Sequence, residues 1–213
     1  MPSRWIVWMM LTLVGSWLIG ALFYYVVAPH RADEKRKRID DVASTVINVV
    51  LYMWLLKLII HVQTFVRDPL AILAYPSDRR MFYGGIVLAV LTLLVQAARK
   101  KQSVERWFVT FVPIALVASF SYEWLLIAQG KGTYTFPYVV LVGIAIGTYL
   151  VGVKRSEWGA AIASSFIWLI GTLWIQQTMM PVVTLFSYRV TGPVIGALTV
   201  ALMIGIVRKK GRD

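Results

Sequence analysis

Seven long apolar blocks constrain this chain more than any other feature of its sequence. They cover approximately residues 5–27, 43–65, 82–98, 107–129, 136–153, 158–178 and 182–207. A run of roughly 17–25 apolar residues can cross the ~30 Å hydrocarbon core of a membrane as a helix. Helices are expected because an open strand leaves its backbone polar groups unpaired in lipid. The sequence therefore predicts an all-α, polytopic membrane bundle of seven transmembrane helices, forming a single domain over residues 1–213.

The composition excludes an ordinary soluble domain. The chain is 59% hydrophobic, whereas soluble domains are about 45–50% apolar. Its net charge of +12 resides mainly in the gaps between apolar blocks, which favours contact with anionic phospholipid headgroups over nucleic acid. The absence of cysteine excludes disulfides, thiolate metal sites and a cysteine nucleophile. The first block is longer than the 7–15 apolar residues of a signal-peptide core, so we expect it to be a membrane span.

The distribution of Lys and Arg predicts the orientation of the chain. Fifteen of these residues fall on the side that holds the 28–42, 99–106, 154–155 and 208–213 segments, and six fall on the other side. Segments rich in Lys and Arg stay in the cytoplasm. The sequence therefore places the N-terminus outside and the C-terminus inside a bacterial-type cytoplasmic membrane, with residues 66–81 facing outward.

Ionisable side chains within the spans are candidates for a functional site, because each costs roughly 2.5–3.5 kcal/mol to insert. Lys57 and His61 lie four residues apart and share a helix face. At ~1.5 Å per residue, Lys57 and Glu123 lie about 4.5 and 7.5 Å outward of the midpoints of their spans. Three interpretations stay open: a structural Lys57–Glu123 ion pair, an outward-facing polar site with His61 as a proton carrier, and a Lys57 that extends to the headgroups.

Tyr83, Gly84, Gly85 and Arg189 complete the candidate site. The Gly-Gly pair lacks Cβ atoms and lets backbone or ligand approach closely. The Arg189 guanidinium, near the outer start of the last span, could bind a phosphate or anchor the chain among headgroups. Gly143 and Gly147 form a small-residue pattern suited to close helix packing.

The sequence assigns no catalytic residue, metal ligand or cofactor. It contains no phosphate-binding loop, no HExxH and no GxSxG motif. The two histidines, His30 and His61, fall on opposite sides of the membrane in the predicted topology, so they are not expected to share a metal ion.

Part of the chain resembles prolipoprotein diacylglyceryl transferase, which moves diacylglyceryl from phosphatidylglycerol to a lipoprotein cysteine. The resemblance covers about fifty residues, from Lys37 to Leu88. Residues 68–73 read Asp-Pro-Leu-Ala-Ile-Leu, similar to the (N/D)-P-L-x-I-L phrase of the family, and residues 83–86 read Tyr-Gly-Gly-Ile, similar to its H-G-G-L. The resemblance also implies seven spans with the N-terminus outside.

The chain departs from that family at the residues that carry its chemistry. Tyr83 stands where the family has histidine, and residues 129–134 read Gln-Gly-Lys-Gly-Thr-Tyr in place of the family's arginine-asparagine signature. The family's outer head domain between spans four and five is reduced here to about six residues. Residues 181–187 match only in part the phrase that opens the family's last span. The resemblance thus implies a divergent paralogue without the transferase activity.

Two classes of function follow. The first is a lipid-handling or non-catalytic transferase-like protein that binds membrane phospholipids at an outward-facing polar site; if it were an enzyme, it would be a phospholipid-dependent transferase. The alternative is a small transporter or an assembly subunit with a membrane-protein partner. A transporter needs a polar route across the midplane, and the inner halves of the spans contain few polar groups.

Overall fold

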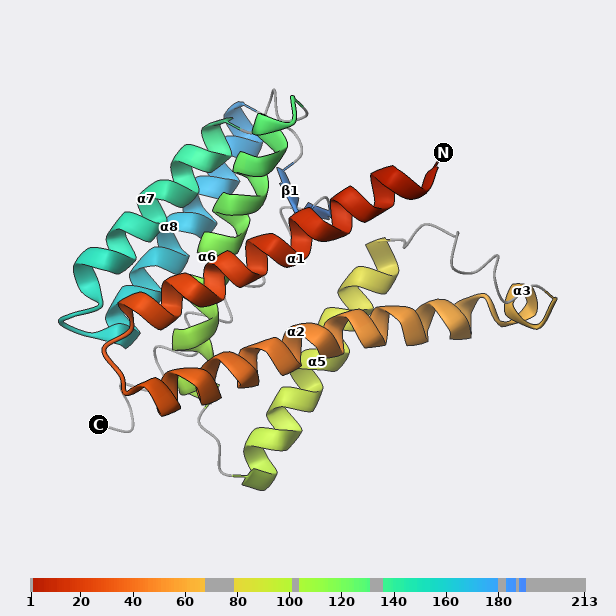
Figure 1. Ribbon diagram of the computed structural model, residues 1–213, viewed down its shortest axis with the longest axis horizontal. Coiled ribbons are helices and arrows are strands. Elements are labelled where there is room, and N and C mark those ends of the chain that lie inside the picture. Colours follow the sequence, from red (N-terminus) through yellow and green to blue (C-terminus); the bar gives the residue numbers. More distant parts are fainter. Residues whose placement is uncertain are drawn as a thin grey trace. The chain divides into compact units, whose positions relative to one another are not determined.

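The computed structural model describes residues 2–67, 79–100, 104–130, 136–179, 183–186 and 188–190. Its elements in chain order are α1 (Pro2–Val27), α2 (Ala32–Ile60), α3 (Val62–Arg67), α5 (Arg79–Lys100), α6 (Val104–Ala128), α7 (Phe136–Gly152), α8 (Glu157–Thr178), β1 (Val183–Leu185) and β2 (Tyr188–Val190) (Figure 1). Five helices, α1, α2, α5, α6 and α8, are long and apolar enough to cross a membrane, and α7 is shorter at 17 residues. The chain is a helical, multi-pass membrane protein.

The second helix begins well before its apolar block. α2 starts at Ala32, eleven residues ahead of the expected start at residue 43, and so includes the charged segment 33–41. Asp33 and Glu34 lie in its first turn, where carboxylates stabilise the positive end of the helix dipole. The charged segment is therefore a helical extension of the span.

The expectation of a helix from residue 182 is wrong for residues 183–186 and 188–190. Residues 183–185 and 188–190 form an antiparallel hairpin in which Val183 pairs with Val190 and Leu185 with Tyr188. β-Branched residues, which favour strands, are frequent in this segment. Phe186, at the turn, has a φ of 49°, which is rarely adopted by a bulky side chain. Residues 191–207 of the expected seventh span lie outside the described part of the chain.

The contacts divide the chain into two compact units. Unit 1 comprises residues 1–35 and 108–213, and unit 2 comprises residues 36–107. Unit 1 is thus assembled from two distant parts of the sequence, and the residues of unit 2 come between these two parts in sequence order.

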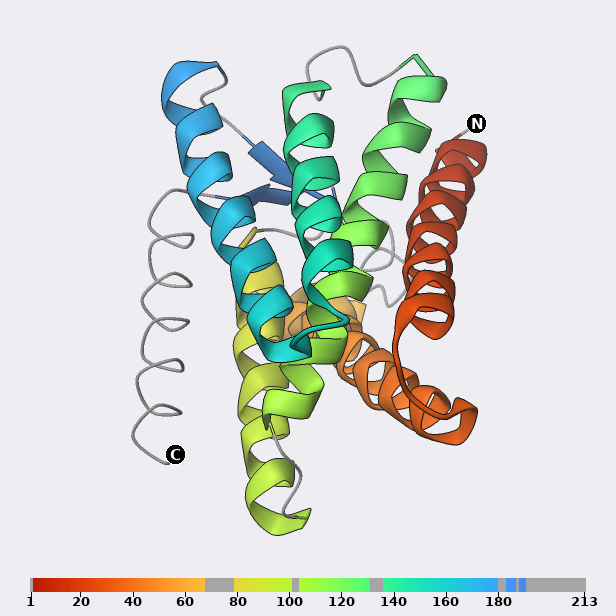
Figure 2. The same ribbon diagram turned by 90° about the vertical axis from the view of Figure 1, so that its left-hand side faces the viewer.

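The core of unit 1 is formed by α6, α7 and α8, which lie side by side (Figure 2). Residues on α6, α7 and α8 form one apolar cluster that includes Val112, Val142, Ala161 and Ile175. α7 and α8 run antiparallel, since Gly152 contacts Ala160 near the connecting turn and Gly171 contacts Leu141 farther along.

α1 lies antiparallel to α6. A Cβ at Gly20 would meet the Ile114 carbonyl oxygen, the Thr110 hydroxyl donates to the Tyr24 phenol oxygen at 3.3 Å, and the Gln129 amide donates to the Thr12 hydroxyl at 3.4 Å. The buried residues of this face of α1 recur every four positions, at Thr12, Ser16, Gly20, Tyr24 and Ala28. Four of these five residues are small and three carry a hydroxyl group, and the face packs against α6.

In unit 2, α2 and α5 pack closely through Gly84 and Gly85. A Cβ at Gly84 would lie 2.6 Å from Leu56 Cδ1, and one at Gly85 would lie 2.9 Å from the Val49 carbonyl oxygen. The hydroxyls of Tyr52 and Thr92 are 2.7 Å apart and join the same two helices. Glycine is required here by the approach of α2.

Candidate functional site

The residues predicted to form one site fall into both units. Lys57, His61 and Tyr83 belong to unit 2, whereas Glu123 and Arg189 belong to unit 1. The ion pair between Lys57 and Glu123 therefore stays a prediction. Arg189 lies in β2, opposite Thr184, and its side chain lies outside the described residues.

Within unit 2, the Gly-Gly pair has a structural explanation. It accommodates α2, as described above, and so the predicted close approach is that of a neighbouring helix. Tyr83 is half-buried beside Phe82, with the ring centroids 5.7 Å apart. Lys57 is buried on α2 and His61 lies half-buried at the junction with α3. The His61 amide donates to the Lys57 carbonyl oxygen at 3.1 Å, so the helical path continues through the junction.

Glu123 is the most deeply buried acid among the described residues. It is 2% exposed, and no described residue forms a hydrogen bond with its Oε2 atom. A buried polar group without a hydrogen bond costs about 1–3 kcal/mol, and each such group in a native protein calls for an explanation, such as a bound ion or ligand.

Tyr138 links this carboxyl to two further polar side chains. The Trp168 indole N–H donates to the Tyr138 phenol oxygen at 3.0 Å, and Tyr138 also forms a side-chain hydrogen bond with Ser119 and interacts electrostatically with Glu123. We call Ser119, Glu123, Tyr138 and Trp168 the Glu123 cluster. Its members come from α6, α7 and α8, so the core of unit 1 positions all of them.

The turn of the β-hairpin packs against residues of α1 and α6. The Phe186 ring lies 5.5 Å from Trp17 and 5.4 Å from Tyr122, the neighbour of Glu123. Tyr122 is 2% exposed. These aromatic contacts offset the strain of the left-handed backbone at Phe186, which is of order 1–3 kcal/mol.

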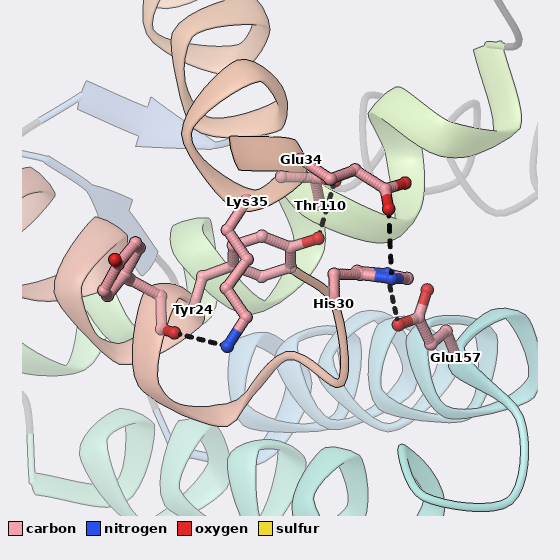
Figure 3. Close-up of polar contacts among 7 residues, drawn as sticks. Tyr24, His30, Glu34, Lys35, Thr110 and Glu157 are labelled. Atoms are coloured by element: carbon pink, nitrogen blue, oxygen red, sulfur yellow. Dashed lines mark hydrogen bonds and ion pairs between the residues drawn. The ribbon is translucent and has the colours of Figure 1, made fainter. Parts of the chain in front are cut away.

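A second polar cluster lies at the opposite end of unit 1 and was not predicted. His30 lies between Glu34 and Glu157 (Figure 3), with Nε2 2.6 Å from the Glu157 carboxylate and Nδ1 3.8 Å from that of Glu34. The side chains of His30 and Glu157 are 18% and 21% exposed. The Nε2–Oε1 contact is short but is not an aligned hydrogen bond.

Neighbouring contacts fix the loop that carries His30. The Lys35 ammonium donates to the Tyr25 carbonyl oxygen at 2.8 Å and lies 5.6 Å from the Tyr25 ring centroid. Ser156 caps α8 by accepting the Gly159 amide at 3.1 Å, which places Glu157 in the first turn. The predicted topology places His30 and Glu157 on one side of the membrane, but a sequence separation of 127 residues gives no sign of their contact.

The two clusters differ in what they can do chemically. The His30 cluster places an imidazole between two carboxyl groups and connects the α1–α2 loop to α8. The Glu123 cluster presents a buried acceptor. No three His, Asp or Glu side chains among the described residues are arranged to hold a metal ion. Compared with protein-family models, characterised proteins and solved structures, the chain matches none.

Proposed function

We propose that this chain is a non-catalytic lipid-handling protein that binds the polar headgroup of a membrane phospholipid at the Glu123 cluster. In this proposal it crosses a bacterial-type cytoplasmic membrane seven times, with the N-terminus outside. Its basic cytoplasmic segments contact anionic headgroups at the inner surface.

The buried Glu123 carboxyl is the observation that carries the proposal. Its Oε2 atom lacks a hydrogen bond with any described residue, so it can accept one from a ligand. Glu123 lies five residues before the end of α6 at Ala128, or about 7.5 Å along the helix axis. Tyr138 lies two residues after the start of α7. A headgroup therefore needs to enter the bundle by only about one and a half helical turns.

The transporter alternative has less support. Several buried hydroxyls in unit 1 donate to carbonyl oxygens of their own helix: Ser16 to Leu13, Ser164 to Ala160, and Thr172 to Trp168. Hydroxyls used in this way do not offer a transported solute a continuous polar route.

Lipid retention tests the proposal. Native mass spectrometry of the purified protein is expected to detect bound phospholipid, and Glu123→Gln is expected to retain less. Glu105→Gln makes the same chemical change at an exposed position on the same helix and should retain as much as the wild type. A wild-type protein without bound lipid, or equal retention by Glu123→Gln, would contradict the proposal.

The non-catalytic part of the proposal makes a separate prediction. A phenol, such as that of Tyr83, can donate a hydrogen bond, whereas a histidine at this place can accept a proton. The purified protein is therefore expected not to transfer diacylglyceryl from phosphatidylglycerol to a lipobox peptide. Tyr83→His alone should not create the reaction, because the arginine-asparagine signature is also missing. A peptide that gains the mass of one diacylglyceryl group would refute this prediction.

A further inference from the structure

The β-hairpin folds back toward the interior of unit 1. The contact between Gly171 and Leu141 sets the level of α8 against α7. It places the end of α8 at Thr178 near the level of the start of α7 at Phe136. Both views draw the two strands below the upper ends of α6, α7 and α8 rather than beyond them (Figures 1 and 2). The chain therefore leaves α8 at one end of the unit and then turns back.

The ring contacts of Phe186 show how far the turn of the hairpin reaches. Phe186 packs against Trp17 on α1 and Tyr122 on α6, with ring centroids 5.5 and 5.4 Å apart. Tyr122 lies six residues before the end of α6, or about 9 Å along the helix. Trp17 lies five residues, or about 7.5 Å, beyond Thr12, whose hydroxyl accepts from Gln129. Both helices thus place the turn roughly 7.5–9 Å inward from the α6–α7 end of the unit.

This depth lies within the hydrocarbon core of a membrane. α6 has 25 residues, which make a helix of about 37 Å. It exceeds the ~30 Å hydrocarbon core by about 4 Å at each end when the helix and the core share a midpoint. The turn of the hairpin therefore lies roughly 4–5 Å below the boundary of the hydrocarbon.

The outer edges of the hairpin need hydrogen-bond partners at this depth. Among the described residues, β1 and β2 pair only with each other, and no backbone hydrogen bond joins either strand to another element. Backbone of this kind is tolerated at membrane depth only where protein buries it or where it lines a water-filled space. Since the described part of the chain supplies no such partner, water is the partner that fits.

We infer that the β1–β2 hairpin re-enters the membrane from the face that holds the α6–α7 connection, and that water follows it to the level of Trp17 and Tyr122. In the predicted orientation this face is the outer one. The left-handed backbone at Phe186 is a constraint of the kind that is found at functional sites. The hydrated hairpin gives a small polar solute access from outside, and this inference does not depend on lipid binding at Glu123.

Cross-linking tests the depth of the turn. The chain contains no cysteine, so Phe186→Cys can be combined with Trp17→Cys or with Trp8→Cys. Trp8 is the control, because it is exposed on the same helix and lies nine residues, or about 13.5 Å, from Trp17. A short bifunctional thiol reagent is expected to join position 186 to position 17 and not to position 8.

A second pair, Phe186→Cys with Tyr122→Cys, provides the same test if the first pair does not fold. A cross-link to position 8 in place of position 17 would put the hairpin at the membrane surface and overturn the inference. The absence of a cross-link in both inner pairs would overturn it as well.

Thiol labelling tests the hydration. Single cysteines at Thr184 and Leu185 sample the two faces of β1, because successive residues of a strand alternate. Ile170→Cys is the control, since Ile170 is exposed on α8 about 12 Å along the helix from its end. A charged, impermeant thiol reagent added outside should label at least one hairpin position about tenfold faster than position 170, because thiolates form in water and hydrocarbon excludes charge. Labelling after denaturation shows that each cysteine can react.

Hydrogen exchange of the wild-type protein in nanodiscs gives a readout without any substitution. The backbone amides of β1 and β2 should exchange faster than those in the middle of α8. Equal protection would show that the rest of the chain covers the strand edges and would refute the inference. Hairpin cysteines that react as slowly as position 170, or that react only in inside-out vesicles, would also refute it.

Discussion

His30 is the single residue whose replacement tests the second polar cluster. Its imidazole lies 2.6 Å from the Glu157 carboxylate, and removing it would leave that half-buried carboxylate without this polar contact. His30→Ala is therefore expected to lower the melting temperature in detergent. His30→Gln should lose less, because its amide can still donate to Glu157.

The exposed neighbour Arg31 supplies the control for this comparison. Arg31→Ala should leave the melting temperature close to that of the wild type. Equal losses at positions 30 and 31 would show that the loop, and not the imidazole, matters for stability.

At the scale of single residues, the sequence identified the buried groups better than their partners. Lys57 and Glu123 were both selected as ionisable residues within spans, and both are buried. Tyr138 and Trp168, which complete the Glu123 cluster, were not selected, because aromatic residues are common in membrane spans and their hydrogen bonds depend on tertiary packing. The same holds for His30 and Glu157, which lie in the α1–α2 loop and at the start of α8, far apart in the sequence.

At the scale of helices, Gly20 is expected to be essential for the packing of α1. A Cβ at this position would collide with the Ile114 carbonyl oxygen on α6, whereas a Cβ at Gly15 meets nothing within 4 Å. Gly20→Ala should destabilise the protein by about 1–3 kcal/mol, as other overpacking changes do. Thermal unfolding in detergent measures this loss.

Gly15→Ala is the matched control on the same helix. Alanine is a better helix former than glycine, so this change should be neutral or slightly stabilising. A loss as large as that of Gly20→Ala would mean that contact with α6 does not explain the effect.

Hydropathy predicted the bounds of most helices well. It failed where a helix is charged and where a turn replaces a helix. The expected spans 107–129, 136–153 and 158–178 differ from α6, α7 and α8 by three residues or fewer at either end. The start of α2 was missed because a charged segment carries no hydropathy signal although it can be helical. The hairpin at residues 183–190 was missed because short β-branched runs look alike in a strand and in a membrane helix. Gly147 has open space around it, so its part of the small-residue pattern marks no close contact.

At the scale of the whole molecule, the predicted topology can be tested directly. The chain contains no cysteine, so single cysteines can be introduced at Arg36 and Asp78. An impermeant thiol reagent added outside is expected to label position 78 and to leave position 36 unlabelled. The basic segment 28–42 should stay in the cytoplasm because positive charge opposes its export.

Labelling with the reverse pattern would overturn this orientation. Membrane permeabilisation provides the control, because it should expose both cysteines equally if both are accessible.

The antiparallel pairing of α1 with α6 sets an order of events during synthesis. Tyr24 and its partner Thr110 are separated by 86 residues, which a ribosome adds in roughly 4–17 s at 5–20 residues per second. Until α6 enters the membrane, the small polar face of α1 lacks its native partner. α1 therefore lacks its native neighbour while α2, α3 and α5 are made, and it completes this contact only when α6 follows.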